Sequence, residues 1–125
     1  MRDFAIELTD RPGELGRVAT ALSRYSVNLK AVTGLAIDHH VLVRIIADDV
    51  EAARSALQGA GIRFTEGEVV QVMLENRAGE LAAVTSKLAE GKLNLHAIYL
   101  TGIVDNLVEL AIVTDDYKKA KRMLE

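Results

Sequence analysis

The chain has 125 residues, of which half are apolar, about a quarter are charged and none is cysteine. This is the balance of a soluble globular protein, and the length fits one domain or two very small ones. The net charge of −3 and the scarcity of aromatics argue against nucleic-acid binding. The missing cysteines exclude disulfides and thiolate metal sites. No apolar run is long enough to cross a bilayer, and the charged N-terminus lacks a signal peptide's apolar stretch. We therefore expect a cytoplasmic protein that binds neither membrane nor nucleic acid.

The first elements follow from periodicity. Phe4, Ile6 and Leu8 alternate as in a half-buried strand. Apolar residues at helical spacing then predict a helix over residues 15–22. Strands are expected at 29–37 and 41–47, with a turn at 38–40, followed by a helix after Asp49 and an extended run over 62–68. This order predicts an α+β, ferredoxin-like βαββαβ unit, a four-stranded antiparallel sheet with both helices on one face.

The chain then repeats itself. TDRPGELGRV at 9–18 returns as ENRAGELAAV at 75–84, and the match continues through both copies, with a one-residue slip in the second hairpin, whose turn is expected near Asp105. We therefore predict two modules, residues 1–67 and 68–125. The second module lacks its last strand within this sequence, which would leave a sheet edge exposed. Either a partner chain supplies a strand or the natural protein continues further.

The repeated phrase is typical of a strand-to-helix turn. We expect the Asp10 carboxylate to cap the following helix and Pro12 to stand at its start. Gly13 allows a backbone φ that other residues resist, and the negative charge of Glu14 is stabilised by the helix dipole. That purely structural interpretation remains open. The alternative is that the helix N-terminus, with its free N–H groups, binds a carboxylate or phosphate. The antiparallel sheet could bring the amides of Asn28 and Asn94, at the starts of the second strands, back to this turn.

The phrases DRPGEL and NRAGEL, followed by VNL at 27–29 and LNL at 93–95, resemble the ACT domain in both copies. The resemblance implies a free-standing tandem ACT protein with a regulatory function, binding an amino acid or related small metabolite at the interface of paired modules. It implies no catalytic activity and no cofactor, a homodimer, and a possible regulated enzyme as partner. The ligand-binding residues that it implies are Asp10, Gly13, Leu15, Asn28, Asn76, Gly79, Leu81 and Asn94.

Two departures from the family's pattern bear on the ligand. Asp10 stands where amide-bearing members have asparagine, and its carboxylate should repel a ligand carboxylate. Leu8 and Leu74 stand where serine-binding members have histidine, so serine recognition of that type is not expected. We therefore expect the Asn76 site to be the better carboxylate site of the two.

Other functions have less support in the sequence. No nucleophile has a nearby base, no glycine loop binds phosphate, and no ligand cluster suggests a metal. His39 and His40 lie at a predicted hairpin tip, and His96 is expected to face solvent from a strand. The remaining alternative is a ligand-free oligomerisation or interaction module that pairs through sheet edges with itself or a partner enzyme.

Overall fold

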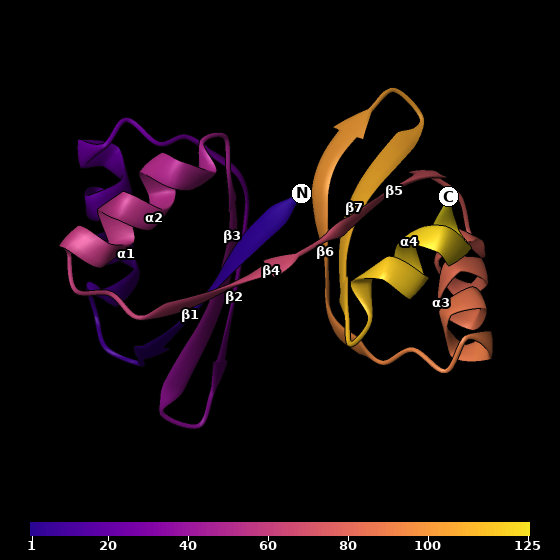
Figure 1. Cartoon of the computed structure of the whole chain (residues 1–125), viewed down its shortest axis with the longest axis horizontal. Coiled ribbons are helices and arrows are strands. Elements are labelled where there is room, and N and C mark those ends of the chain that lie inside the picture. The colour runs from indigo at the N-terminus through magenta and orange to yellow at the C-terminus, as the bar shows by residue number, and fades with distance from the viewer. The chain divides into compact units, whose positions relative to one another are not determined.

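A computed structural model describes all 125 residues and divides into two compact units. Module 1 is the unit Arg2–Gly67, and module 2 is Glu68–Glu125 together with Met1. Each module is an α+β unit with two helices on one face of an antiparallel sheet (Figure 1). The predicted pair of ferredoxin-like modules is confirmed, including the missing last strand of the second.

Module 1 contains all six elements of the predicted order. They are β1 Arg2–Thr9, α1 Glu14–Arg24, β2 Leu29–Ile37, β3 His40–Ala47, α2 Val50–Gly59 and β4 Phe64–Glu68. The strands are ordered β2-β3-β1-β4, so β3 and β1 are central. The last strand begins at Phe64, two residues after the predicted start, because the left-handed Gly61 and the two residues after it complete the turn from α2.

The core of module 1 lies between the sheet and its two helices. Alternate residues of β1 and β3 face the helices in register, Phe4 opposite Ile45 and Ile6 opposite Val43. These side chains pack against one buried stripe on each helix, Val18, Ala21 and Leu22 on α1 and Ala53, Ala56 and Leu57 on α2. The aromatic rings of Phe4 and Phe64 of β4 are in contact, with their centroids 5.4 Å apart. The fourth strand thus packs against this core.

Module 2 repeats the first five elements. They are β5 Val70–Glu75, α3 Glu80–Glu90, β6 Leu95–Val104, β7 Leu107–Thr114 and α4 Tyr117–Leu124, with strand order β5-β7-β6. Its core combines Val70 and Val72 of β5 with Val84, Leu88, Ile112 and Ala120. By the repeat, β5 corresponds to β1, and no strand of the module lies along its outer edge.

The turns that were predicted from the sequence are present. Asp38 and Asp105 have positive φ in the two hairpin turns, and Asp49 and Asp116 cap α2 and α4 by accepting backbone N–H bonds. A cap of this kind stabilises a helix by about 1 kcal/mol. His96 is exposed on β6, as expected. Among the helices, none combines the length and the apolar character that crossing a membrane requires.

Candidate ligand-binding site

Each repeated phrase forms a strand-to-helix turn with a glycine at its centre. Gly13 and Gly79 are the N-cap residues of α1 and α3, with φ of 86° and 93° in the left-handed region that glycine tolerates best. The predicted freedom of these glycines is therefore confirmed. Neither helix has a side-chain cap, so the expectation that Asp10 caps α1 is wrong. Pro12 also precedes the N-cap instead of starting the helix.

The missing side-chain caps leave polar groups available at the start of each helix. In α3 the first bond within the helix runs from Ala83 N to Gly79 O at 3.0 Å. The N–H groups between these residues have no partner within the helix, as at any helix N-terminus. They carry the positive end of the helix dipole, which attracts an anion. The turn therefore presents N–H donors that a carboxylate can accept.

Arginine and glutamate side chains form ion pairs beside both turns. Arg77 lies 2.9 Å from Glu75 and 3.0 Å from Glu80, measured between nitrogen and oxygen. In module 1, Arg11 donates to Glu14 at 3.0 Å, and this bond is the main reason that the pKa of Glu14 is lowered. Because each arginine is already paired with a carboxylate, the N–H groups of the turn are the main unpaired donors for an added anion.

A groove lies beside the turn of module 2. Its cavity volume is about 340 Å³, within the range of small-ligand sites. The turn contributes Glu75, Asn76, Arg77 and Glu80, and the floor is apolar. The apolar lining is formed by Leu74, Leu81, Ile98, Tyr99, Leu100, Val108 and Leu110. Of the predicted site residues, Asn76 and Leu81 thus lie in one groove, with Gly79 between them in the chain.

The floor of this groove was not predicted from the sequence. Ile98 and Leu100 are opposite Ile112 and Leu110 of β7, so they face the helices, yet they remain 38% and 50% exposed. Leu81, on the first turn of α3, is 53% exposed. Half-exposed apolar side chains under a polar rim are a common form of ligand site. Side chains along β6 alternate between the two faces of the sheet, so the sequence indicates which of them face the helices. It does not indicate that the helices leave these side chains exposed.

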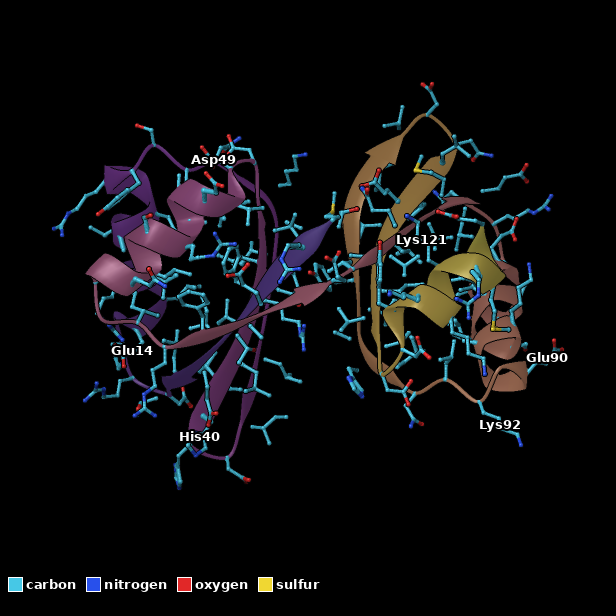
Figure 2. All side chains as sticks on the ribbon, in the orientation of Figure 1. Glu14, His40, Asp49, Glu90, Lys92 and Lys121 are labelled. Atoms are coloured by element: carbon cyan, nitrogen blue, oxygen red, sulfur yellow. The ribbon has the colours of Figure 1, made fainter.

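Asn28 does not return to the turn of its own module. Asp10 N donates to His39 O at 2.9 Å at one end of the sheet, whereas Asn28 N donates to Asp48 at 3.0 Å at the other. Both β1 and β2 are antiparallel to β3, so β2 runs parallel to β1 and begins where β1 also begins. The length of β2 separates the two sites by roughly 25 Å. Figure 2 shows Glu14 and His40 at one end of module 1 and Asp49 at the other.

Asn94 occupies the corresponding place in module 2. Its backbone N and its side-chain Nδ2 both donate to the carboxylate of Asp115, each at 3.1 Å. Asn76 instead donates through its backbone to Asn106 O at the hairpin end, at 2.8 Å. The structure therefore gives Asn94 a local role, joining the start of β6 to the end of β7. The expectation that the sheet brings Asn28 and Asn94 to the turns is wrong within each module.

Module 1 differs at the positions that correspond to the groove. Asp10 replaces Asn76, and Gly34 stands where module 2 has Leu100. Leu15 is half exposed, like Leu81. The first turn therefore has a carboxylate where the second has an amide, and a glycine where the second has a large apolar side chain. That the Asn76 site is the better of the two stays a prediction.

The remaining titratable groups form no second site of this kind. His40 Nδ1 lies 2.9 Å from Glu7 at the hairpin end of the sheet, and both side chains are mostly exposed. No group of three or more histidine, aspartate or glutamate side chains is placed to hold a metal ion. The most perturbed carboxyl is that of Glu66, whose pKa is lowered to about 2 by hydrogen bonds from Arg54 and Arg2. This network joins β4 to α2 and β1 and stabilises the sheet.

Comparisons with known proteins identify the fold. No family model and no curated protein matches the chain. Among solved structures, it is similar to protein BT0572 from Bacteroides thetaiotaomicron, with 23% identity and a TM-score of 0.87, covering 98% of this chain and 85% of the other. It is also similar to the ligand-free regulatory subunit of aspartate kinase from Thermus thermophilus, with 15% identity and a TM-score of 0.66, covering 98% and 88%.

A third similar structure contains the alpha and beta subunits of aspartokinase, with 15% identity, a TM-score of 0.67 and the same two coverages, 98% and 88%. These likenesses extend over both modules. The protein therefore has a tandem ACT-type fold.

Proposed function

We propose that the protein is a regulatory protein that binds an amino acid or related small metabolite in the groove of module 2. One observation carries the proposal: Asn76 and the uncapped N-terminus of α3 stand directly over an apolar floor. A ligand carboxylate would accept hydrogen bonds from the first N–H groups of α3 and from the Asn76 amide. Its side chain would lie on Leu81 and Leu100, and Glu75 offers a carboxylate to the ammonium.

The groove is open on one side, and we propose that a second copy of the chain closes it in a homodimer. In that arrangement, Asn28 and Asn94, which lie far from the turns of their own modules, would approach the turns of paired modules. The sites at Asp10, Gly13 and Leu15 would be the weaker ones because of the Asp10 carboxylate. The likeness to an aspartate kinase regulatory subunit further supports an enzyme as the regulated partner. We place the protein in the cytoplasm and assign it no catalytic activity of its own.

A thermal-shift screen against the twenty amino acids, each at millimolar concentration, tests the proposal. A ligand at a hundred times its dissociation constant adds about 2.7 kcal/mol to the free energy of unfolding. In a chain of this size, this raises the melting temperature by several degrees. Stabilisation by one amino acid or a small related group is expected. A flat panel would contradict the proposal.

Titration calorimetry of variants then locates the site. Asn76→Ala should weaken binding of the screened ligand by about tenfold or more, because the hydrogen bond that the Asn76 amide donates to the ligand carboxylate is lost. Asp10→Ala should leave this affinity unchanged. Gln71→Ala is the matched control, because Gln71 bonds Glu109 on the sheet face away from the helices. If Asp10→Ala abolishes binding while Asn76→Ala does not, the assignment to module 2 is wrong.

A further inference from the structure

The polar side chains of the groove in module 2 gather at one end of it. They come from residues 75–80 of the turn and form the rim, whereas the floor is formed by apolar residues of β5, α3, β6 and β7. Tyr99 also lines the groove, but its side chain faces the other side of the sheet, because its neighbours Ile98 and Leu100 face the helices. No side chain of the floor therefore offers a hydrogen bond to a ligand.

The other polar groups close to the floor are already engaged or point elsewhere. The hydroxyl of Thr85, one helical turn after Leu81, lies 3.0 Å from Leu81 O and 3.1 Å from Ala82 O and so bonds to α3 itself. The peptide groups of the strands lie in the plane of the sheet and do not point up into the groove. A hydroxyl or amide of a ligand placed over the floor would therefore have no protein partner.

The rim carries more negative than positive charge. Arg77 pairs with Glu75 at 2.9 Å and with Glu80 at 3.0 Å, so one guanidinium stands against two carboxylates. This excess attracts the ammonium of an amino acid and repels a second carboxylate on its side chain. The rim therefore disfavours acidic amino acids.

The floor extends away from the turn along β6. Leu100 is opposite Leu110 and Ile98 is opposite Ile112, and these two pairs are about 7 Å apart along the strand. Leu100 is nearer to the turn, and it is 50% exposed against 38% for Ile98. A ligand whose carboxylate is held at the turn would thus cover more apolar surface as its side chain becomes longer.

We propose that the groove selects amino acids with an aliphatic side chain of three or four carbons, and that Leu81 and Leu100 determine this preference. The inference rests on the proposed function, because the turn must hold the carboxylate and ammonium of the ligand. Each carbon that the floor removes from water strengthens binding by up to about fourfold. A hydroxyl or amide in the same place loses its bonds to water and gains none, which weakens binding by about tenfold.

A series of straight-chain amino acids measures the contact with the floor. Alanine, 2-aminobutyrate, norvaline and norleucine differ by one methylene at each step and share the groups that bind the turn. In titration calorimetry with the full chain, the dissociation constant should fall about two- to fourfold per methylene as far as norvaline. A dissociation constant that does not change along the series would overturn the proposal.

Two pairs of amino acids of nearly equal shape test the polarity of the floor. Valine should bind about tenfold more tightly than threonine, and leucine about tenfold more tightly than asparagine. Aspartate should bind more weakly than asparagine, because its side-chain carboxylate meets the negative rim. Equal affinities within the first two pairs would contradict an apolar floor as the selecting surface.

The Leu100→Ala variant tests the residue that is proposed to determine the preference. Norvaline should bind to it about fivefold more weakly, whereas the affinity for alanine should stay the same, because alanine does not reach this part of the floor. Met73→Ala is the matched control. Met73 is 49% exposed and lies opposite Glu109 on the other face of the sheet, so this change should leave the whole series unaltered. An equal loss for all four amino acids in Leu100→Ala would overturn the role of Leu100.

Failure of this inference can be distinguished from failure of the proposed function. If none of the amino acids binds at millimolar concentration, both are wrong. If amino acids bind and Asn76→Ala weakens their binding, but threonine binds as tightly as valine, the turn holds the ligand and the floor does not select it. The proposed function would then stand and the inference would be wrong.

Discussion

The stability of the turn in module 2 should depend on the left-handed backbone conformation of Gly79. Its φ of 93° lies in the region that side chains with a Cβ resist. A Cβ built at this position meets no heavy atom within 4 Å, so alanine would cause no clash. The free-energy cost of Gly79→Ala then comes only from holding alanine in a left-handed backbone conformation, about 1–2 kcal/mol. We expect the free energy of unfolding of module 2 to fall by that amount.

Urea denaturation followed by far-UV circular dichroism measures this change, with amide resonances of module 2 as a local probe. The urea midpoint should fall by about 1 M for a module of this size. Gly102→Ala is the matched control, because a Cβ there also meets nothing within 4 Å and its φ is outside the left-handed region. Its effect should stay within about 0.5 kcal/mol. Gly79→Asn should cost less than Gly79→Ala, since asparagine tolerates this conformation better.

Equal stability of Gly79→Ala and Gly102→Ala would refute the reasoning, because the two positions differ in backbone conformation and not in available space. The same variant bears on the site. A backbone forced toward negative φ would turn the first N–H groups of α3 away from the groove. If Gly79→Ala unfolds more easily yet binds the screened ligand as tightly as the native protein, the N–H groups are not the carboxylate donors.

Three further predictions follow from charges and caps. Bonds from Arg54 lower the pKa of Glu66 from 4.5 to about 2, so its stabilisation is present above pH 4.5 and is lost as pH falls toward 2. Glu66→Gln should therefore cost about 1–2 kcal/mol at pH 7 after solvent screening, and almost nothing at pH 2, in urea titrations at both pH values. Asp49→Ala should cost about 1 kcal/mol by the same assay, because the cap of α2 is lost. In calorimetry, Asn76→Asp should abolish carboxylate binding in module 2, whereas Asp10→Asn should create or strengthen it in module 1.

Much of the fold could be predicted because local and long-range patterns agree. The repeat fixes the element order twice, and alternation along β1 and β5 indicates the buried face. The two aspartate pairs after β3 and β7 indicate helix starts, and Asp49 and Asp116 do cap them. Predictions of this kind depend on residues close in sequence, whose geometry a short segment already determines.

The predictions that are wrong concern the direction of strands in the sheet and the choice of residue at a helix N-cap. Antiparallel return of the chain predicts Asn28 near Asp10, but β3 lies between β1 and β2 and is antiparallel to both. The strands β1 and β2 therefore run parallel, and Asn28 and Asp10 lie at opposite ends of the sheet. Asp10 was expected to cap α1, but Gly13 takes the N-cap position and leaves the carboxylate outside the helix. The groove could not be predicted, because it depends on how far α3 extends over β6, which no local pattern specifies.

The two copies share one plan but differ where the ligand is proposed to bind. Module 1 has a fourth strand, and an Arg54–Glu66 pair joins this strand to α2. Module 2 has an amide at its turn and a half-exposed apolar floor beside it. The exposed floor lowers stability in the absence of a ligand, since apolar surface in contact with water costs free energy. A ligand that covers the floor would recover that free energy on binding. Ligand binding should therefore stabilise module 2 more than module 1, and local amide exchange can resolve the difference.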